Sequence, residues 1–461
     1  MTIAYSRNWN AARPELTARS RSIVIIGGGA SGVLMAAHLL RSSGSDLDVT
    51  IVEKRPSLGR GLAYSTSFPD HLLNVRASNM SAFADDPDHF VRWIKARGVE
   101  AEDASTHFAP RRLYGEYLEQ LLLESDRDLN ARPPRVKVVS GSCIGIDRVG
   151  DQTLVRMADG QTIAAEHCIL ATGHDEKPCH DIGDEGQGED SRAPALILGT
   201  GLSMVDTCVA LLLEGYTGPI IALSRRGLLP AVHTRTVPVK FTKADIPLGS
   251  HPWVFVRWLR SVVDETEARG GGWRDVVDGL RPFNQEIWRN WSNEYRRAFF
   301  RHLKAWWDIH RHRMAPQIHE LLARAIADGQ IQVIAGRLLG TEKTTEGCIA
   351  SIQHRASKQI EQIGVSRVYD CAGVIADPAR SSNPLIRSLL NSGMARCDYM
   401  RIGLDVSPDG ELLKRDGSLS YGLYAVGPLT RGTLLEIEAI PDIRVQCQNL
   451  ANALLRRMAP V

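Results

Sequence analysis

The chain has 461 residues, of which 43% are apolar and 23% are charged, and its formal net charge is +2. This length allows two or three domains, and the composition is ordinary for a globular protein. Because the net charge is close to zero, charge gives no argument for binding to nucleic acid or to a membrane, and we expect neither partner.

The cysteines and the first residues indicate the compartment. None of the eight cysteines has CxxC spacing, so we expect no metal site and no redox-active dithiol. Residues 1–20 lack the apolar core of a secretory signal and are expected to form a disordered tail. No apolar run approaches the ~20 residues that a membrane helix needs. We therefore expect a cytoplasmic protein.

Residues 21–53 predict a strand, a tight turn, a helix and a second strand. Three glycines have the spacing G-x-G-x-x-G: Gly27, Gly29 and Gly32. The first allows a sharp turn, the second lets a pyrophosphate approach the backbone, and the third lets the helix lie close to the sheet. Ser31 lies at the start of the helix, whose free N–H groups suit phosphate. Glu53 ends the second strand, where a carboxylate would accept hydrogen bonds from ribose hydroxyls.

Loops and two helices are predicted next. The polar stretch 71–83 follows the first two strands and is placed to fold back over a bound cofactor. Helices are expected at 88–97 and 113–123, where apolar residues recur with helical spacing.

A run of strands follows these helices. Alternating residues over 135–157 predict antiparallel strands, and a turn separates them from a strand within 162–170. That strand runs into the small residues Thr172 and Gly173. Residues 180–192 are polar, acidic and glycine-rich, and we expect a surface linker.

A second strand–turn–helix–strand unit begins at residue 195. Its turn and helix start contain Gly199, Gly201 and Ser203. The next strand is followed by Arg225 instead of an acid, and a basic residue there suits a 2′-phosphate, so we expect NADPH. Met204 stands where a small residue usually allows close packing, which predicts a helix set further from its strand.

Residues 235–330 interrupt the α/β pattern and contain seven of the nine tryptophans. Part of this region is strongly helical and basic, and helical spacing puts His302, Trp306 and His310 on one face. We predict an inserted helical region. Such a face can line a pocket or pack in the core, and the sequence leaves both possibilities open.

The α/β pattern then resumes. We expect a strand at 331–334, a strand hairpin over 348–371, and a late strand that leads into Gly427. A terminal helix over 443–456 opens with Pro441-Asp442, which are favourable first-turn residues.

This set of features resembles the flavoproteins with two dinucleotide-binding domains. The resemblance implies an α/β fold with two Rossmann-like domains, FAD on the first glycine motif and NADPH or NADH on the second. Pro428 stands where that group commonly has an acid, so the ribityl contact is expected from backbone or from Thr430. Carried over by position, the FAD residues are Gly27, Gly29, Ser31, Gly32, Glu53, Thr172, Gly173 and Gly427, and the nicotinamide-nucleotide residues are Gly199, Gly201, Ser203 and Arg225.

The resemblance also divides the chain into domains. We expect a tail at 1–20, an FAD-binding domain from 21–192 and 376–461, an NAD(P)H-binding domain from 193–234 and 331–375, and the insertion at 235–330.

Four stretches resemble one bacterial family of FAD/NAD(P)-binding proteins that includes an FAD-dependent urate hydroxylase. They are HLLNVRASNMSAF at 71–83, FAPRRLYGEYL at 108–118, SRRGLLP at 224–230 and WWDIHRHRMAP at 306–316. The resemblance implies a monooxygenase that consumes NAD(P)H and O2 and hydroxylates a small electron-rich molecule through a C4a-hydroperoxyflavin. Urate, giving 5-hydroxyisourate, is one candidate. A planar anion needs aromatic stacking and cationic donors, and the candidate residues are Arg76, His302, Trp306, His310 and Arg313.

Other functions stay open. One is an N-hydroxylase or another flavin oxidoreductase that acts on an amino acid or amine. Another is a reductase with a disulfide or protein acceptor, which would need a dithiol near the flavin. A nonenzymatic nucleotide-binding sensor is a third. The sequence does not determine the oligomeric state.

Overall fold

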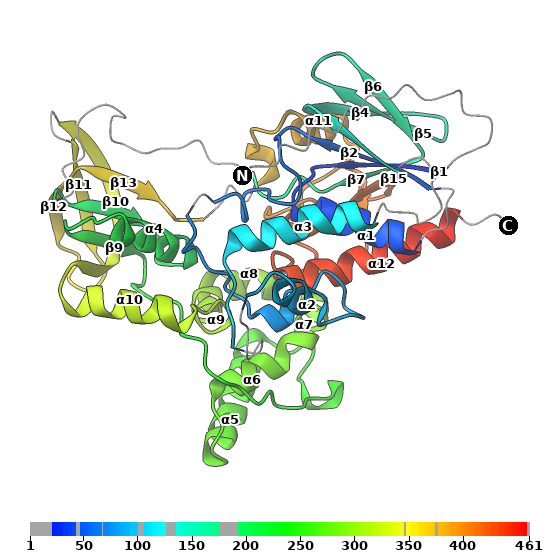
Figure 1. Cartoon of the computed structure of the whole chain (residues 1–461). Helices are drawn as coiled ribbons and strands as arrows, with labels where there is room; N and C mark the ends of the chain where they lie inside the picture. Colours follow the sequence, from blue (N-terminus) through cyan, green and yellow to red (C-terminus); the bar gives the residue numbers. More distant parts are fainter. Residues whose placement is uncertain are drawn as a thin grey trace.

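The computed structural model contains two α/β domains and a group of inserted helices (Figure 1). It describes residues 21–42, 47–66, 68–99, 106–125, 135–175, 192–344, 347–373 and 377–458. The tail expected at 1–20 lies outside the described residues, and so does the linker expected at 180–192, except for its last residue.

The first domain is built on a six-stranded sheet with the order β14-β15-β7-β1-β2-β3. Strands from β15 to β3 run parallel, and β14 is antiparallel to β15. The strands are β1 (Arg21–Ile26), β2 (Leu47–Glu53), β3 (Val136–Ser140), β7 (His167–Leu170), β14 (Glu411–Leu413) and β15 (Leu419–Ala425). The helices on one face are α1 (Ala30–Ser42), α2 (His89–Lys95), α3 (Arg111–Ser125) and α12 (Ile440–Met458).

Strand β1 shows why this sheet is covered on both faces. Ile23 and Ile25 point into the core beneath the helices, while Val24 and Ile26 point into a second core. Successive side chains of a strand alternate between faces, so an uninterrupted apolar run requires cover on both sides. The second core is closed by α11 (Pro384–Ser392) and by an antiparallel sheet of β4 (Cys143–Val149), β5 (Gln152–Met157) and β6 (Thr162–Ala165).

The second domain has a sheet with the order β12-β11-β10-β9-β8-β13. Its strands are β8 (Ala195–Leu198), β9 (Ile220–Ser224), β10 (Ile331–Thr344), β11 (Gly347–His354), β12 (Ile360–Val365) and β13 (Arg367–Asp370). Helices α4 (Leu202–Leu213) and α10 (Pro316–Ala327) pack on it in one core. Because α10 belongs to this core, the structure ends the insertion before Pro316 and not at residue 330.

Two strand predictions were wrong. Strand β3 was expected to be antiparallel to its neighbours, but it pairs in parallel with β2 at the edge of the first sheet. The hairpin predicted over 348–371 consists of β11 and β12 only, and β13 is a separate strand that pairs in parallel with β8. Alternation identifies a half-buried strand but does not identify its partner, which lies far away in the sequence.

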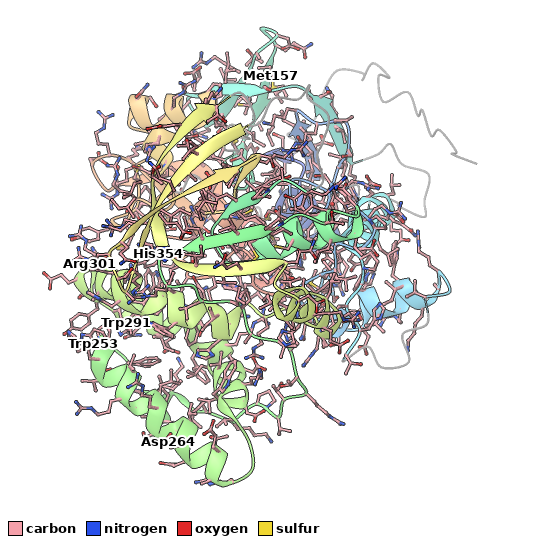
Figure 2. The ribbon with its side chains drawn as sticks, turned by 90° about the vertical axis from the view of Figure 1, so that its left-hand side faces the viewer. Met157, Trp253, Asp264, Trp291, Arg301 and His354 are labelled. Atoms are coloured by element: carbon pink, nitrogen blue, oxygen red, sulfur yellow. The ribbon has the colours of Figure 1, made fainter. Side chains whose placement is uncertain are left out.

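The inserted helices form their own core beside α12. They are α5 (Pro252–Ala268), α6 (Trp273–Leu280), α7 (Asn284–Asn290), α8 (Asn293–Ala298) and α9 (Lys304–Arg311). Trp288 and Trp291 are buried in this core together with Leu435, which comes from the segment before α12. Helix α5, which carries Trp253 and Asp264, projects from the rest of the molecule (Figures 1 and 2). Within the described parts of the chain, no helix is long and apolar enough to cross a membrane.

Candidate functional site

The first glycine turn joins β1 to α1 with no room for side chains at two positions. Gly27 has a φ of 106°, and a Cβ there would lie 2.4 Å from the carbonyl oxygen of Ala171. A Cβ on Gly32 would lie 1.9 Å from the carbonyl oxygen of Gly27. Both glycines are therefore required by the close packing of turn, helix and strand, as predicted.

Gly29 has a different environment. A Cβ there would meet no protein atom outside its own turn closer than Gly61 Cα, at 3.4 Å. A Cβ on Gly29 would thus make an ordinary van der Waals contact with the backbone of Gly61 and no clash, and the bare backbone at the start of α1 fits the approach of a phosphate. Beside this turn, Glu53 accepts hydrogen bonds from the N–H groups of Gly28, at 2.6 Å, and Arg55, at 2.8 Å. These contacts hold the carboxylate where the ribose-binding acid is expected.

The ends of β7 and β15 meet the same turn. Thr172 and Gly173 follow β7, and Gly427 follows β15 with a φ of 70°. A Cβ on Gly427 would lie 2.4 Å from Ser31 Oγ, so the late strand comes directly against the start of α1. The residues predicted to bind FAD therefore gather at the carboxyl edge of the first sheet, where ligands of open α/β sheets bind.

Thr430 does not fit its predicted role. Its hydroxyl is fully buried, donates to the carbonyl of Gly427 at 2.9 Å and accepts from Gln446 Nε2 at 3.0 Å. These contacts hold the loop after β15 against α12. Because the Thr430 hydroxyl already donates to Gly427 and accepts from Gln446, these contacts favour the backbone over the Thr430 side chain for the expected ribityl contact.

The second turn repeats the geometry of the first. Gly199 has a φ of 100°, and a Cβ there would lie 2.4 Å from the carbonyl oxygen of Cys371. This matches the first turn, where a Cβ on Gly27 would lie at the same distance from the carbonyl oxygen of Ala171. Gly201 precedes α4 with nothing within 4 Å of a Cβ and caps the helix without a side-chain hydrogen bond. Met204 is 1% exposed between α4 and the sheet. The second unit thus holds a methionine where the first has no room for a methyl group, in agreement with a helix set further out.

An open cleft of about 460 Å³ lies between the two domains. This volume is within the range of ligand sites. One wall is the 62–71 loop together with Arg111, and the other is the start of α4, including Ser203. The lining residues are Leu62, Ala63, Ser65, Thr66, Phe68, His71, Arg111, Ser203, Asp206, Thr207 and Cys371.

Arg111 and Asp206 were missed by the sequence analysis. The Arg111 guanidinium and the Asp206 carboxylate form an ion pair of 2.8 Å across the cleft. His71 adds a hydrogen bond of 3.2 Å from Nε2 to the carbonyl of Asp206. Burial raises the pKa of Asp206, while the nearby Arg111 opposes this rise. The only sequence signal was that His71 and Arg111 fall within two of the stretches shared with the bacterial family.

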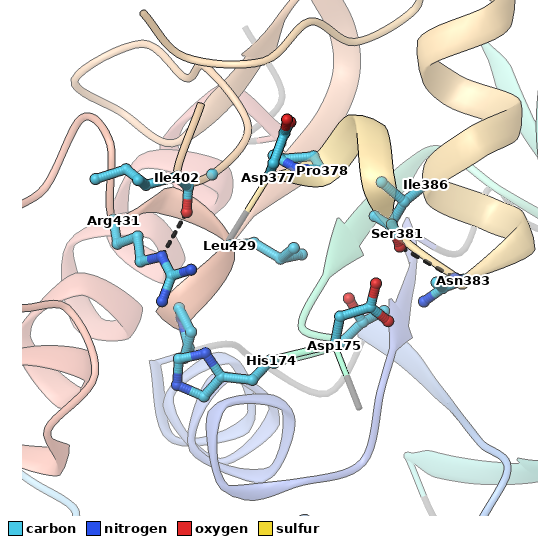
Figure 3. Close-up of a pocket in the computed structure, with 14 residues that line it drawn as sticks. His174, Asp175, Asp377, Pro378, Ser381, Asn383, Ile386, Ile402, Leu429 and Arg431 are labelled. Carbon is cyan, nitrogen blue, oxygen red and sulfur yellow. Dashed lines mark hydrogen bonds between the residues drawn. The ribbon is translucent and has the colours of Figure 1, made fainter. Parts of the chain in front are cut away.

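A smaller pocket lies at the end of β7, between Thr172, Gly173 and Arg431 (Figure 3). Its volume of about 40 Å³ holds one or two water molecules but no substrate. The charged side chains around it already have partners: Arg431 pairs with Glu438 at 2.9 Å, and Asp175 accepts the N–H of Ser382 at 3.0 Å. We therefore place the candidate site in the larger cleft.

The predicted face of His302, Trp306 and His310 is not continuous. A π-helical turn at Phe299–Leu303 precedes α9 and changes the spacing on which the prediction depended. The His302 ring packs 5.9 Å from the Trp253 ring of α5. The Trp306 side chain is 47% exposed, so the alternative that it packs in the core is wrong.

His310 and Arg313 lie together beside α6. Arg313 is 2% exposed, and its guanidinium nitrogens lie 3.0 and 2.9 Å from the carboxylate oxygens of Asp278. The His310 ring packs 4.2 Å from Trp273, and burial lowers the pKa of His310, so its imidazole is neutral at pH 7. An anion beside this pair would therefore meet an arginine whose charge is already compensated by Asp278 and an uncharged histidine ring.

Arg76 contacts the segment that leads from the second domain into the insertion. Its guanidinium donates to the carbonyl of Thr234. The neighbouring His233 is hydrogen-bonded to the carbonyl of Asn74 at 3.0 Å, and burial lowers the pKa of His233 to about 4. The stretch 71–83 thus runs along the path into the insertion and reaches the cleft through His71.

Comparisons with known proteins agree with this architecture. Residues 24–175 match a family described as FAD-NAD(P)-binding. The structure of the ornithine N-hydroxylase of Kutzneria sp. 744 is similar with a TM-score of 0.65 and 15% identity, covering 95% of this chain and 100% of that chain. The L-lysine 6-monooxygenase of Pseudomonas syringae gives a TM-score of 0.64 and 14% identity, with 95% and 99% covered.

A curated relative matches part of the chain. The 3-dehydro-bile acid delta(4,6)-reductase of Clostridium scindens is 26% identical over 178 residues, which are 36% of this chain and 42% of the relative. The match thus spans less than half of the relative's length. At these identities the solved structures establish the fold alone. The chain has the two-domain FAD/NAD(P)-binding flavoprotein fold, as predicted.

Proposed function

We propose that this protein is an FAD-dependent monooxygenase that uses NADPH or NADH and O2 to hydroxylate a small electron-rich molecule. One observation carries the proposal: the 460 Å³ cleft is lined on one side by the start of α4 and on the other by the 62–71 loop. That loop follows Gly61, which packs against Gly29 of the first turn. A nucleotide bound at the first glycine turn and one bound at the second would therefore both extend toward this cleft.

The residues have separable roles in this proposal. Bound FAD would accept hydride and activate O2, which protein side chains cannot do alone. The starts of α1 and α4 would bind phosphates through free N–H groups, and Glu53 would bind ribose. The inserted helices, which pack against the segment before α12, would restrict water on that side.

The cysteines argue against a disulfide reductase. Cys371 lines the cleft, and its neighbour Cys208 is buried in the core. Burial raises the pKa of Cys208 to about 12, so this thiol is protonated at neutral pH. Thiol–disulfide exchange needs a thiolate, which makes these two residues an unsuitable redox pair.

Two substrate classes follow from the proposal. Urate is one, and it would stack on an aromatic residue and contact cationic donors. An amino acid or amine is the other, supported by the chain-wide structural similarity to an ornithine N-hydroxylase and to an L-lysine 6-monooxygenase. Asp278 already compensates the charge of Arg313, which is one of the cations expected to bind the urate anion. This ion pair therefore favours an amino acid or amine as the substrate.

The test is a substrate screen on the flavin-loaded protein. NADPH oxidation, O2 consumption, peroxide and hydroxylated product are measured with urate, other purines, and amino or diamino acids. One molecule of hydroxylated product per NADPH for one candidate would support the proposal and name its class. Peroxide as the only product with every candidate would contradict a monooxygenase, and an absence of NADPH oxidation would favour a sensor.

A further inference from the structure

The ion pair between Arg111 and Asp206 joins the two dinucleotide-binding domains across the cleft. Arg111 is the first residue of α3 in the first domain, and Asp206 lies in α4 of the second. Their side chains are 18% and 22% exposed, and the closest nitrogen and oxygen are 2.8 Å apart. Arg111 Nε also donates to the carbonyl of Leu72 at 3.0 Å, which anchors one end of the guanidinium in the first domain.

The position of Asp206 relative to the predicted nucleotide site is unfavourable for an anion. Asp206 lies three residues after Ser203, so the two are separated by about one helical turn, or ~4.5 Å along the axis. Both line the cleft. A carboxylate at this distance repels a phosphate unless a cation compensates it, and Arg111 is the cation in contact with it.

We propose that Arg111 is a nucleotide-binding residue that the first domain contributes to the second. Asp206 holds the Arg111 guanidinium beside the start of α4, and a phosphate of the nicotinamide nucleotide replaces Asp206 as its partner on binding. This inference depends on the proposed function, because it needs a nucleotide at the second glycine turn. A guanidinium has five N–H donors in a planar fork, so it can contact phosphate while Nε keeps its bond to Leu72. Binding would then connect the two domains through the ligand.

The proposal and a simple structural latch make opposite predictions for the two partners. If the ion pair only holds the domains together, loss of either partner has the same effect. If Arg111 binds phosphate, removal of Arg111 weakens the nucleotide complex. Removal of the Asp206 charge then strengthens the complex, because the guanidinium is released from a competing anion.

The experiment measures the Kd of NADP+ and of NAD+ for the flavin-loaded protein by calorimetry. For R111M we expect roughly tenfold weaker NADP+ binding, the effect of one lost charge-assisted hydrogen bond. For D206N we expect tighter binding, and adding R111M to D206N should still weaken NADP+ binding, because the guanidinium that contacts the phosphate is lost. Equal weakening of NADP+ and NAD+ binding by R111M would indicate that Arg111 contacts the pyrophosphate. Weakening of NADP+ binding alone would indicate that it contacts the 2′-phosphate.

Arg112 provides a matched control on the same helix. Its side chain is 58% exposed and pairs with Glu116 at 3.9 Å, so R112M should leave both Kd values unchanged. Flavin content and melting temperature are recorded for every variant. If R111M does not fold, R111K keeps the charge but loses the fork, and it should still bind NADP+ more weakly than the wild type.

Three results would overturn the inference. They are an unchanged Kd for R111M, equal weakening by R111M and D206N, and an unchanged Kd when R111M is added to D206N, which would indicate that Arg111 only compensates the charge of Asp206. Failure of the wild type to bind either nucleotide would instead contradict the proposed function.

Discussion

Arg311 of α9 and Glu436 form a buried ion pair that fastens the inserted helices to the segment before α12. Arg311 Nε lies 2.9 Å from Glu436 Oε2, and the side chains are 12% and 9% exposed. Glu436 also accepts hydrogen bonds from Trp307 and Asn284. Its φ of 61° is unfavourable for a residue other than glycine, at a cost of about 1–3 kcal/mol, and these three donors hold it there.

Loss of the Glu436 carboxylate should destabilise the protein strongly. Glu436→Ala leaves the buried Arg311 charge with only the more distant carboxylate of Asp442, at 3.9 Å, so the cost in the free energy of unfolding should approach about 3–5 kcal/mol. Urea denaturation measures this change. Glu265→Ala is the control, because Glu265 is 65% exposed and pairs with Arg269 on the surface, where about 0–1 kcal/mol is expected. Similar losses in both variants would contradict a special role for the buried pair.

The same pair predicts a pH dependence. Burial opposes ionisation of Glu436, but Arg311 and the other donors outweigh it, so the pKa of Glu436 lies below its usual value. A lowered pKa in the folded state contributes stability above the unfolded pKa of about 4.3, and this stability is lost as the pH falls through the folded pKa. The stability difference between wild type and Glu436→Gln should be constant near pH 7 and shrink below pH ~4. A difference that grows in acid would give the wrong sign.

The two glycine turns allow a reciprocal test. Gly29→Val should abolish FAD binding, because the added side chain stands where a phosphate is expected at the start of α1, while its Cβ meets the Gly61 backbone only at van der Waals distance. Gly201→Val should keep the flavin, because a Cβ there meets no protein atom within 4 Å and the fold is not disturbed. It should weaken NADPH binding, because the added side chain stands where a phosphate is expected at the start of α4. Flavin absorbance and NADP+ calorimetry on both variants check this. A yellow Gly29→Val protein would show that the first turn was misassigned.

Arg225 and Arg226 follow β9, and Arg225 is exposed. Replacement of both by Glu should repel a 2′-phosphate and weaken NADPH relative to NADH. A charge-assisted contact contributes ~1.5–3 kcal/mol, so the ratio of kcat/KM for the two nucleotides should change by roughly tenfold or more. An unchanged ratio would show that these arginines do not contact the 2′-phosphate.

Two tryptophans of the insertion should respond differently to truncation. Trp288 is completely buried, and Trp288→Ala should cost about 3–5 kcal/mol. Trp306→Ala should cost clearly less than Trp288→Ala, because about half of the Trp306 surface is exposed and less apolar area is lost. If the substrate stacks on Trp306, this variant should also release more peroxide per NADPH. An unaltered coupling of product to NADPH would remove Trp306 from the substrate site.

The sequence by itself determined both glycine turns and their place in the fold. Gly27 and Gly199 need positive φ values and an absent Cβ, and these are local requirements that only glycine meets. The apolar runs around them determined the strands and helices for the same reason, since each period depends on neighbouring residues alone.

The tertiary structure decided which distant residues meet. Arg111 and Asp206 become partners only when two domains pack together, and Glu436 meets Arg311 only through the packing of the insertion on α12. The π-helical turn at Phe299–Leu303 likewise takes His302 out of the helical spacing that Trp306 and His310 keep in α9. Contacts of this kind are set by the packing of whole elements, and no local periodicity in one chain encodes them.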